Sequence, residues 1–148
     1  MMVVIYEDNH IVIVSKDAGE IVQGDKTGDT PLSESVKAYI KEKYNKSGNV
    51  YIGVPHRLDR PVSGIVVLAR TSKALSRLSE MFRDGEVKKT YWAIVKNMPP
   101  KNEDELVHYL VRNEKLNKSF AYDKEVPNSK KAILHYKLIG KSDNYYLL

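Results

Sequence analysis

The stretch from Pro55 to Gly64 most constrains how this chain can fold. It reads Pro-His-Arg-Leu-Asp-Arg-Pro-Val-Ser-Gly and lies directly before an apolar stretch, residues 65–69. Two prolines and a glycine leave such a segment few backbone conformations, so it predicts a rigid loop. The loop carries an imidazole, two guanidinium groups and a carboxylate beside a predicted buried strand. Because functional residues often lie on loops held by a scaffold, this signature loop is the first place to expect a site.

Asp59 lies between Arg57 and Arg60 in the signature loop. Positive charges within contact distance keep a carboxylate ionised. An ionised carboxylate in a fixed position acts as a nucleophile, a base or an orienting group. The alternative is a structural aspartate that forms an ion pair with an arginine or stabilises a turn. The residue types alone leave both alternatives open.

Apolar periodicity predicts two helices. The first begins with Thr30 as N-cap and Pro31 at the first helical position, and it ends near Gly48. Its apolar face consists of residues three and four apart, namely Leu32, Val36, Tyr39, Ile40 and Tyr44. The second helix is capped by Thr71 or Ser72 and stops at residues 84–85. Its apolar face consists of Ala74, Leu75, Leu78, Met81 and Phe82.

Runs of β-branched, apolar and aromatic residues predict the strands. These are residues 3–6, 10–16, 65–69, 88–96, 106–111, 120–122, 131–139 and a last strand from 145. The first two form a hairpin. In the strand 88–96, Tyr91 shares a face with Lys89 because side chains alternate. Hairpin-like connections and two helices together predict an α+β fold in a single domain of residues 1–148.

Composition narrows the class of partner and the compartment. The 24 lysines and arginines against 19 acidic residues give a formal net charge of +5, which favours an anionic partner such as nucleic acid. The absence of cysteine excludes a disulfide framework and a cysteine nucleophile, and it fits a cytoplasmic protein. Neither an apolar run of membrane-spanning length nor a basic start is present, so we expect no membrane span and no signal peptide.

Three motifs in order resemble those of the RluA-type RNA pseudouridine synthases. The signature loop matches His-Arg-Leu-Asp, then two residues, then Val62-Ser63-Gly64, an apolar stretch and Ala69-Arg70-Thr71. Downstream, residues 88–93 resemble the family's Lys-x-Tyr motif. Upstream, Lys16 and Gly19 resemble the end of its opening hairpin, with Asp17 in place of the usual proline. The resemblance runs from about residue 3 to the last residue.

The resemblance implies a fold and a reaction. The fold is a mixed, mostly antiparallel sheet flanked by helices, with an active cleft across one face. The reaction isomerises a uridine of structured RNA, either rRNA or tRNA, to pseudouridine, and it needs neither a metal nor an organic cofactor. Asp59 is the implied catalytic carboxylate. Attack on sugar C1′, attack on base C6 and removal of a C2′ proton all remain open.

The resemblance also implies residues that bind the substrate. The target base leaves its stack, and Arg57 fills the vacated space or forms an ion pair with Asp59. Tyr91 stacks on the uracil or, as the alternative, is a half-buried tyrosine of the sheet. His56 orients the loop through a backbone hydrogen bond or, as the alternative, acts as an acid or base.

Five cations are candidates for contacts to RNA phosphates, which fix the register of the RNA. These are Lys16, Arg60, Arg70, Lys88 and Lys89. For Lys16 the alternative is a solvated side chain at the end of a strand.

The family pattern continues past a strand like 145–148 into a Thr-Gly-Arg-x-His-Gln-Ile-Arg type motif, whose arginine pairs with the catalytic aspartate. No such motif occurs in these 148 residues. We therefore expect the N-terminal portion of a catalytic domain, without a separate N-terminal RNA-binding domain. A different class of function is a non-catalytic RNA-binding module of the same fold. A third is a hydrolase that uses Asp59 and His56, although it lacks a second acid or a metal cluster.

Overall fold

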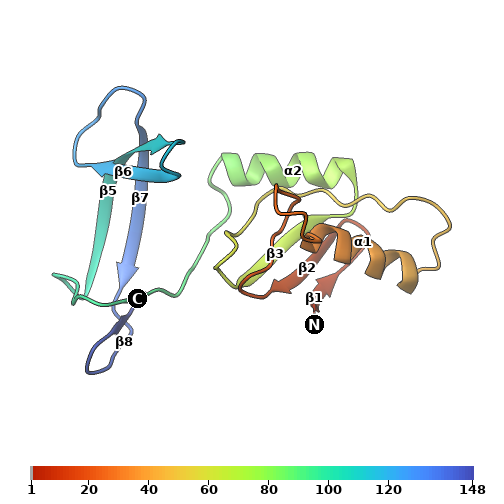
Figure 1. Ribbon diagram of the computed structural model, residues 1–148, viewed down its shortest axis with the longest axis horizontal. Coiled ribbons are helices and arrows are strands. Elements are labelled where there is room, and N and C mark those ends of the chain that lie inside the picture. The colour runs from red at the N-terminus through yellow and green to blue at the C-terminus, as the bar shows by residue number, and fades with distance from the viewer. Residues whose placement is uncertain (1) are drawn as a thin grey trace. The chain divides into compact units, whose positions relative to one another are not determined.

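The computed structural model describes residues 2–148, which form two compact units (Figure 1). Unit 1 extends to Lys88, and unit 2 comprises Lys89–Leu148. No helix within the described residues is long and apolar enough to cross a membrane.

Unit 1 contains a three-stranded antiparallel sheet in the order β1-β2-β3. Its strands are β1 (Val3–Glu7), β2 (Ile11–Lys16) and β3 (Gly64–Ala69). The Asp8 side chain shapes the turn between β1 and β2, because its Oδ1 accepts hydrogen bonds from the backbone N–H groups of His10 and Ile11. This confirms the predicted hairpin and the predicted strand after the signature loop.

The core of unit 1 lies between one face of this sheet and helix α1 (Leu32–Lys43). Val12 pairs with Leu68 and Val14 with Val66, and all four side chains are buried. The helix contributes the predicted apolar positions Leu32, Val36 and Ile40. Period-2 burial on the strands and helical spacing on α1 therefore meet in one apolar layer.

The predicted start of α1 was wrong by one position. Pro31 is the N-cap residue, and no side chain caps the helix. Instead, the N–H groups of Leu32 and Ser33 donate to the carbonyls of Ile21 and Val22, at 2.8 and 3.2 Å. Because this neighbouring segment satisfies the donors at the helix start, a capping hydroxyl from Thr30 is not required.

The ends of the helices differ in how well they were predicted. Helix α1 stops at Lys43, and Asn45 rather than Gly48 takes the left-handed conformation, with φ 47°. Helix α2 (Ser72–Arg83) has Thr71 as its N-cap, whose Oγ1 accepts from the N–H of Ala74 at 3.1 Å. Gly85, with φ 75°, follows its last turn, as the sequence predicts.

Unit 2 contains two small antiparallel sheets. One has the order β6-β5-β7, formed by β6 (Lys118–Tyr122), β5 (Glu103–Asn113) and β7 (Lys130–Lys137). The other has the order β4-β9-β8, formed by β4 (Ile94–Val95), β9 (Tyr146–Leu147) and β8 (Gly140–Lys141). No residue of this unit is buried within the described part of the chain.

The predicted strand 88–96 is largely wrong. Only Ile94–Val95 forms a strand, and its pairing with β9 extends by one step, to the hydrogen bonds between Ala93 and Leu148. Residues 88–92 pair with no strand in the described chain, so their alternation has no ladder to support it. The α+β class is confirmed. Every strand pairing among residues 2–148 is antiparallel, and the strands form three sheets instead of one.

Candidate functional site

In the signature loop, the candidate catalytic residue Asp59 begins a short turn. The N–H of Val62 donates to the carbonyl of Asp59 at 3.0 Å, which closes a turn over Arg60 and Pro61. The side chains of Asp59 and Arg57 are exposed. The carboxylate of Asp59 is therefore open to a reacting group from solvent. At the end of the loop Gly64 has φ 143°, a conformation that favours glycine.

Lys16 fixes the backbone of this turn through hydrogen bonds from its side chain. Its side chain is completely buried, and its Nζ donates to the carbonyls of Asp59 and Arg60 at 3.2 Å each and of Val62 at 2.5 Å. The same Nζ also donates a hydrogen bond to the carbonyl of Asp17 at 3.1 Å. A buried ammonium group is tolerated only where such partners replace water.

Both predictions for Lys16 were wrong, because a buried ammonium group contacts neither RNA phosphates nor solvent. The sequence does contain a signal for this position. Val12, Val14 and Lys16 alternate on β2, and all three are buried on the same face. A lysine that continues a buried alternation indicates a charge paired inside the fold.

His56 anchors the other half of the loop to the edge of the sheet. Its Nε2 accepts a hydrogen bond from the backbone N–H of Val67 at 3.0 Å. Its ring stacks on Phe82 of α2, with centroids 4.4 Å apart and planes 24° from parallel. A nitrogen that accepts this bond carries no proton, so the ring is neutral with its proton on Nδ1. This contact fits the loop-orienting alternative, and a substrate role for His56 stays a prediction.

Arg60 pairs with a different part of the chain than expected. Its Nη2 lies 2.8 Å from Asp29 Oδ2 and 3.6 Å from Asp25 Oδ2, and it donates to Thr27 Oγ1 at 2.8 Å. No ion pair joins Asp59 to a neighbouring arginine within the described residues. The hydrogen bond with Asp29 raises the pKa of Arg60. These partners lie in residues 25–29, which we call the acidic loop. This loop was not identified from the sequence, because nothing in its own residues indicates that it faces the signature loop.

A second charged cluster joins β1 to the end of α1. Glu7 Oε1 accepts from Lys43 Nζ at 2.8 Å and from the Tyr44 hydroxyl at 2.5 Å. Burial alone would raise the pKa of Glu7, but the hydrogen bonds from Lys43, Tyr44 and Tyr39 outweigh burial and lower it to about 2. The cluster contains none of the predicted site residues, and we interpret it as a stabilising contact.

Tyr91 and Lys89 belong to unit 2. Tyr91 is 57% exposed, and the Lys89 side chain is also exposed. Both lie in the segment that forms no strand, so the shared face predicted for them is not established by a ladder. Their roles in substrate binding stay predictions.

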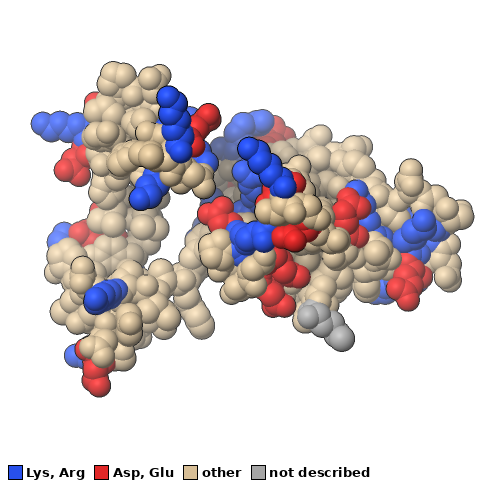
Figure 2. All heavy atoms as spheres, viewed as in Figure 1, with Lys and Arg blue, Asp and Glu red and all other residues tan. Residues whose placement is uncertain are grey.

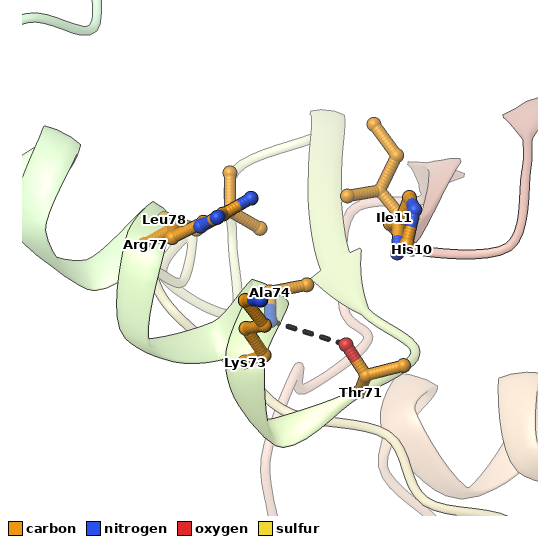
Figure 3. A pocket seen from close by; sticks show the side chains of 7 residues that line it. All are labelled: His10, Ile11, Thr71, Lys73, Ala74, Arg77 and Leu78. Carbon is orange, nitrogen blue, oxygen red and sulfur yellow. Dashed lines mark hydrogen bonds between the residues drawn. The ribbon is translucent and has the colours of Figure 1, made fainter.

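Figure 3 shows an apolar groove in unit 1, with a volume of about 250 Å³. It lies between the start of β2 and the first turns of α2. Its lining residues are His10, Ile11, Thr71, Lys73, Ala74, Arg77 and Leu78. None of the predicted site residues lines it, so the groove is separate from the signature loop.

Comparison with known proteins places the chain in a family. The family model described as RNA pseudouridylate synthase matches residues 10–148. An RNA pseudouridine synthase of Zymomonas mobilis is 33% identical over 94% of this chain and 61% of its own length. The tRNA pseudouridine synthase C of Pectobacterium carotovorum is 28% identical over 97% of this chain and 36% of its own. The ribosomal large subunit pseudouridine synthase C of Rickettsia felis is 30% identical over 97% of this chain and 45% of its own.

Solved structures give the same fold. Human RNA Pseudouridylate Synthase Domain Containing 4 superposes with a TM-score of 0.79 at 20% identity, over 97% of this chain and 56% of that chain. The chain thus spans about one third to three fifths of the length of these relatives. The resemblance predicted from the signature loop is confirmed, and this chain belongs to the RNA pseudouridylate synthase family.

Proposed function

We propose that this protein isomerises a uridine of structured RNA to pseudouridine, with Asp59 as the catalytic carboxylate. The main support is the arrangement of the signature loop. The Asp59 side chain is exposed, while the backbone around it is fixed by the buried ammonium group of Lys16. A reactive group held in one place loses little freedom when the substrate arrives.

The reaction balances within the nucleotide. The bond between N1 and C1′ breaks, a bond between C5 and C1′ forms, C5 loses its hydrogen, and N1 gains one. The product is an isomer of the substrate. The target base leaves the helical stack to reach Asp59, with Arg57 entering the vacated space and Tyr91 stacking on the uracil.

The substrate class follows from the relatives and from charge. Relatives are named as acting on tRNA or on ribosomal RNA of the large subunit. A net charge of +5 suits an RNA partner. Arg60 contacts phosphates in this proposal once RNA displaces the acidic loop, and Lys89 does so from unit 2.

The test is release of tritium from RNA that carries 5-tritiated uridine. Asp59→Ala is expected to reduce release at least about a thousandfold, because it removes the reacting group. The matched control is Asp84→Ala, which removes another exposed carboxylate of unit 1 and is expected to leave release unchanged. Equal release from Asp59→Ala and the unsubstituted chain would reject Asp59. Retained RNA binding without any release would instead support a non-catalytic RNA-binding module.

A further inference from the structure

The sheet β6-β5-β7 has one face that is rich in aromatic and lysine side chains. Directly opposed residues of an antiparallel pair share a face. The register runs without a shift along β5, so Tyr122, Tyr109 and Lys131 lie in one row and Phe120 lies opposite Val111 in the next. We call this surface the aromatic face, formed by Tyr109, Val111, Lys118, Phe120, Tyr122 and Lys131.

The two faces of the same sheet differ in chemistry. At this level the opposite face carries neither phenylalanine nor tyrosine, and it mixes aliphatic and small residues with polar and basic ones. These are Leu106, Leu110, Ala121, Ala132 and Leu134, with His108, Arg112, Ser119 and Lys130. Phe120 and Tyr122 are each 44% exposed, so both rings are open to a ligand. Exposed rings on a sheet, with cations alongside, form the kind of surface on which single-stranded RNA bases stack.

The spacing of the rings suits neighbouring bases. Adjacent strands lie about 4.8 Å apart, and alternate residues along a strand are about 7 Å apart. Phe120 and Tyr122 are alternate residues of β6, so their rings stand about 7 Å apart on one face. Neighbouring unstacked nucleotides span a similar distance, so each ring can take one base.

Charge favours RNA as the occupant. Unit 2 has eleven basic side chains against seven acidic ones, whereas unit 1 has thirteen against twelve, so unit 2 carries most of the net charge of +5. Figure 2 shows basic side chains spread over unit 2. On the aromatic face, Lys118 and Lys131 flank the rings. The acids of that face, Glu103 and Glu105, lie at the far end of β5, where Glu105 is 3.2 Å from His135.

We propose that the aromatic face binds unstacked bases of single-stranded RNA, with Phe120 and Tyr122 as stacking surfaces and Lys118 and Lys131 at phosphates. This rests on the proposed function, since it supplies a further contact for the RNA substrate. It adds a substrate-binding surface that is separate in sequence from the signature loop.

The test is the affinity of the full chain for a fluorescent oligouridylate of about eight nucleotides, measured by anisotropy. The double variant Phe120→Leu/Tyr122→Leu keeps apolar volume but removes both rings, and it is expected to bind about tenfold or more weakly. Tyr122→Phe keeps the ring and is expected to bind within about twofold of the unsubstituted chain. Lys131→Met is expected to reduce the slope of log affinity against log salt by about one.

Tyr136→Leu is the matched control, because Tyr136 lies on the opposite face of the same sheet. It is expected to leave affinity unchanged. The proposal fails if the double variant binds as tightly as the unsubstituted chain, or if Tyr136→Leu weakens binding equally.

Photocrosslinking covers the case in which the double variant does not fold. An oligonucleotide with 5-iodouridine is crosslinked to the unsubstituted chain. Adducts on Phe120 or Tyr122 support the proposal, and adducts confined to peptides outside residues 109–131 overturn it.

The outcome is independent of catalysis. Weak binding by the double variant, together with no tritium release from any form, would support the aromatic face and reject the proposed reaction. Normal binding by the double variant with Asp59-dependent release would reject the aromatic face and support the proposed reaction.

Discussion

Unit 1 and unit 2 both contain antiparallel strands, but they differ in whether the side chains of those strands are buried. In unit 1 a helix covers one face of the sheet, and Val12, Val14, Val66 and Leu68 have no exposed surface. In unit 2 no described residue is buried, and Ile133 and Leu134 are each more than half exposed. The same alternating pattern thus gives a core in one unit and two open faces in the other.

The difference shows what a strand pattern does and does not specify. Alternation fixes which residues share a face, but burial requires a second layer. Unit 1 supplies that layer with α1. The rigid support of unit 1 also explains why the signature loop can present an exposed carboxylate on a fixed backbone.

The largest expected effect comes from a matched pair of core substitutions. Leu68→Ala in β3 is expected to lower the free energy of unfolding of unit 1 by about 2–5 kcal/mol, because it leaves a cavity. Ile133→Ala in β7 is expected to cost less than about 1 kcal/mol, because that side chain is 54% exposed. Hydrogen exchange followed by mass spectrometry measures both units separately. Equal losses of unfolding free energy in the two variants would show that the two units do not differ in burial as described.

The next effect concerns the buried cation of unit 1. Lys16→Met is expected to lower the free energy of unfolding by about 2–4 kcal/mol, because carbonyls of the turn lose their donor. Hydrogen exchange at the N–H of Val62 is expected to speed up as the turn loosens. The control, Lys41→Met on the exposed surface of α1, is expected to change stability by less than about 0.5 kcal/mol. Equal effects of the two substitutions would show that Lys16 does not hold the loop.

Much of unit 1 was predictable because its signals are local and agree with each other. The hairpin, β3, the apolar faces of both helices and the Thr71 cap follow from periodicity and capping rules. The errors arise where distant segments take part. The carbonyls of Ile21 and Val22 replace the expected cap of α1, and strand 88–96 lacks a partner for most of its length.

The candidate site divides in the same way. The motif around Asp59 identified the loop and the family. The partners of Arg60 and Lys16 come from residues far along the chain, so composition and spacing did not reveal them. His56 is intermediate, since a backbone contact was expected but its acceptor role and its packing on Phe82 were not.

The smallest effect is a pH dependence confined to unit 1. Because the pKa of Glu7 is lowered from 4.5 to about 2, its contribution to stability is complete above pH 4.5 and is lost as pH falls toward 2. Glu7→Gln is expected to flatten the stability of unit 1 over this range, as measured by urea unfolding at several pH values. An unchanged pH profile in Glu7→Gln would remove the cluster as a source of acid sensitivity.

The reach of Lys16 has a consequence for the order of folding. Its ammonium group bonds to carbonyls 43 to 46 residues further along the chain. Those bonds form only after β2 and the segment before β3 have come together, and closing so long a loop is slow compared with forming a hairpin. We therefore expect the carboxylate-bearing turn to acquire its final shape after the β1–β2 hairpin has formed.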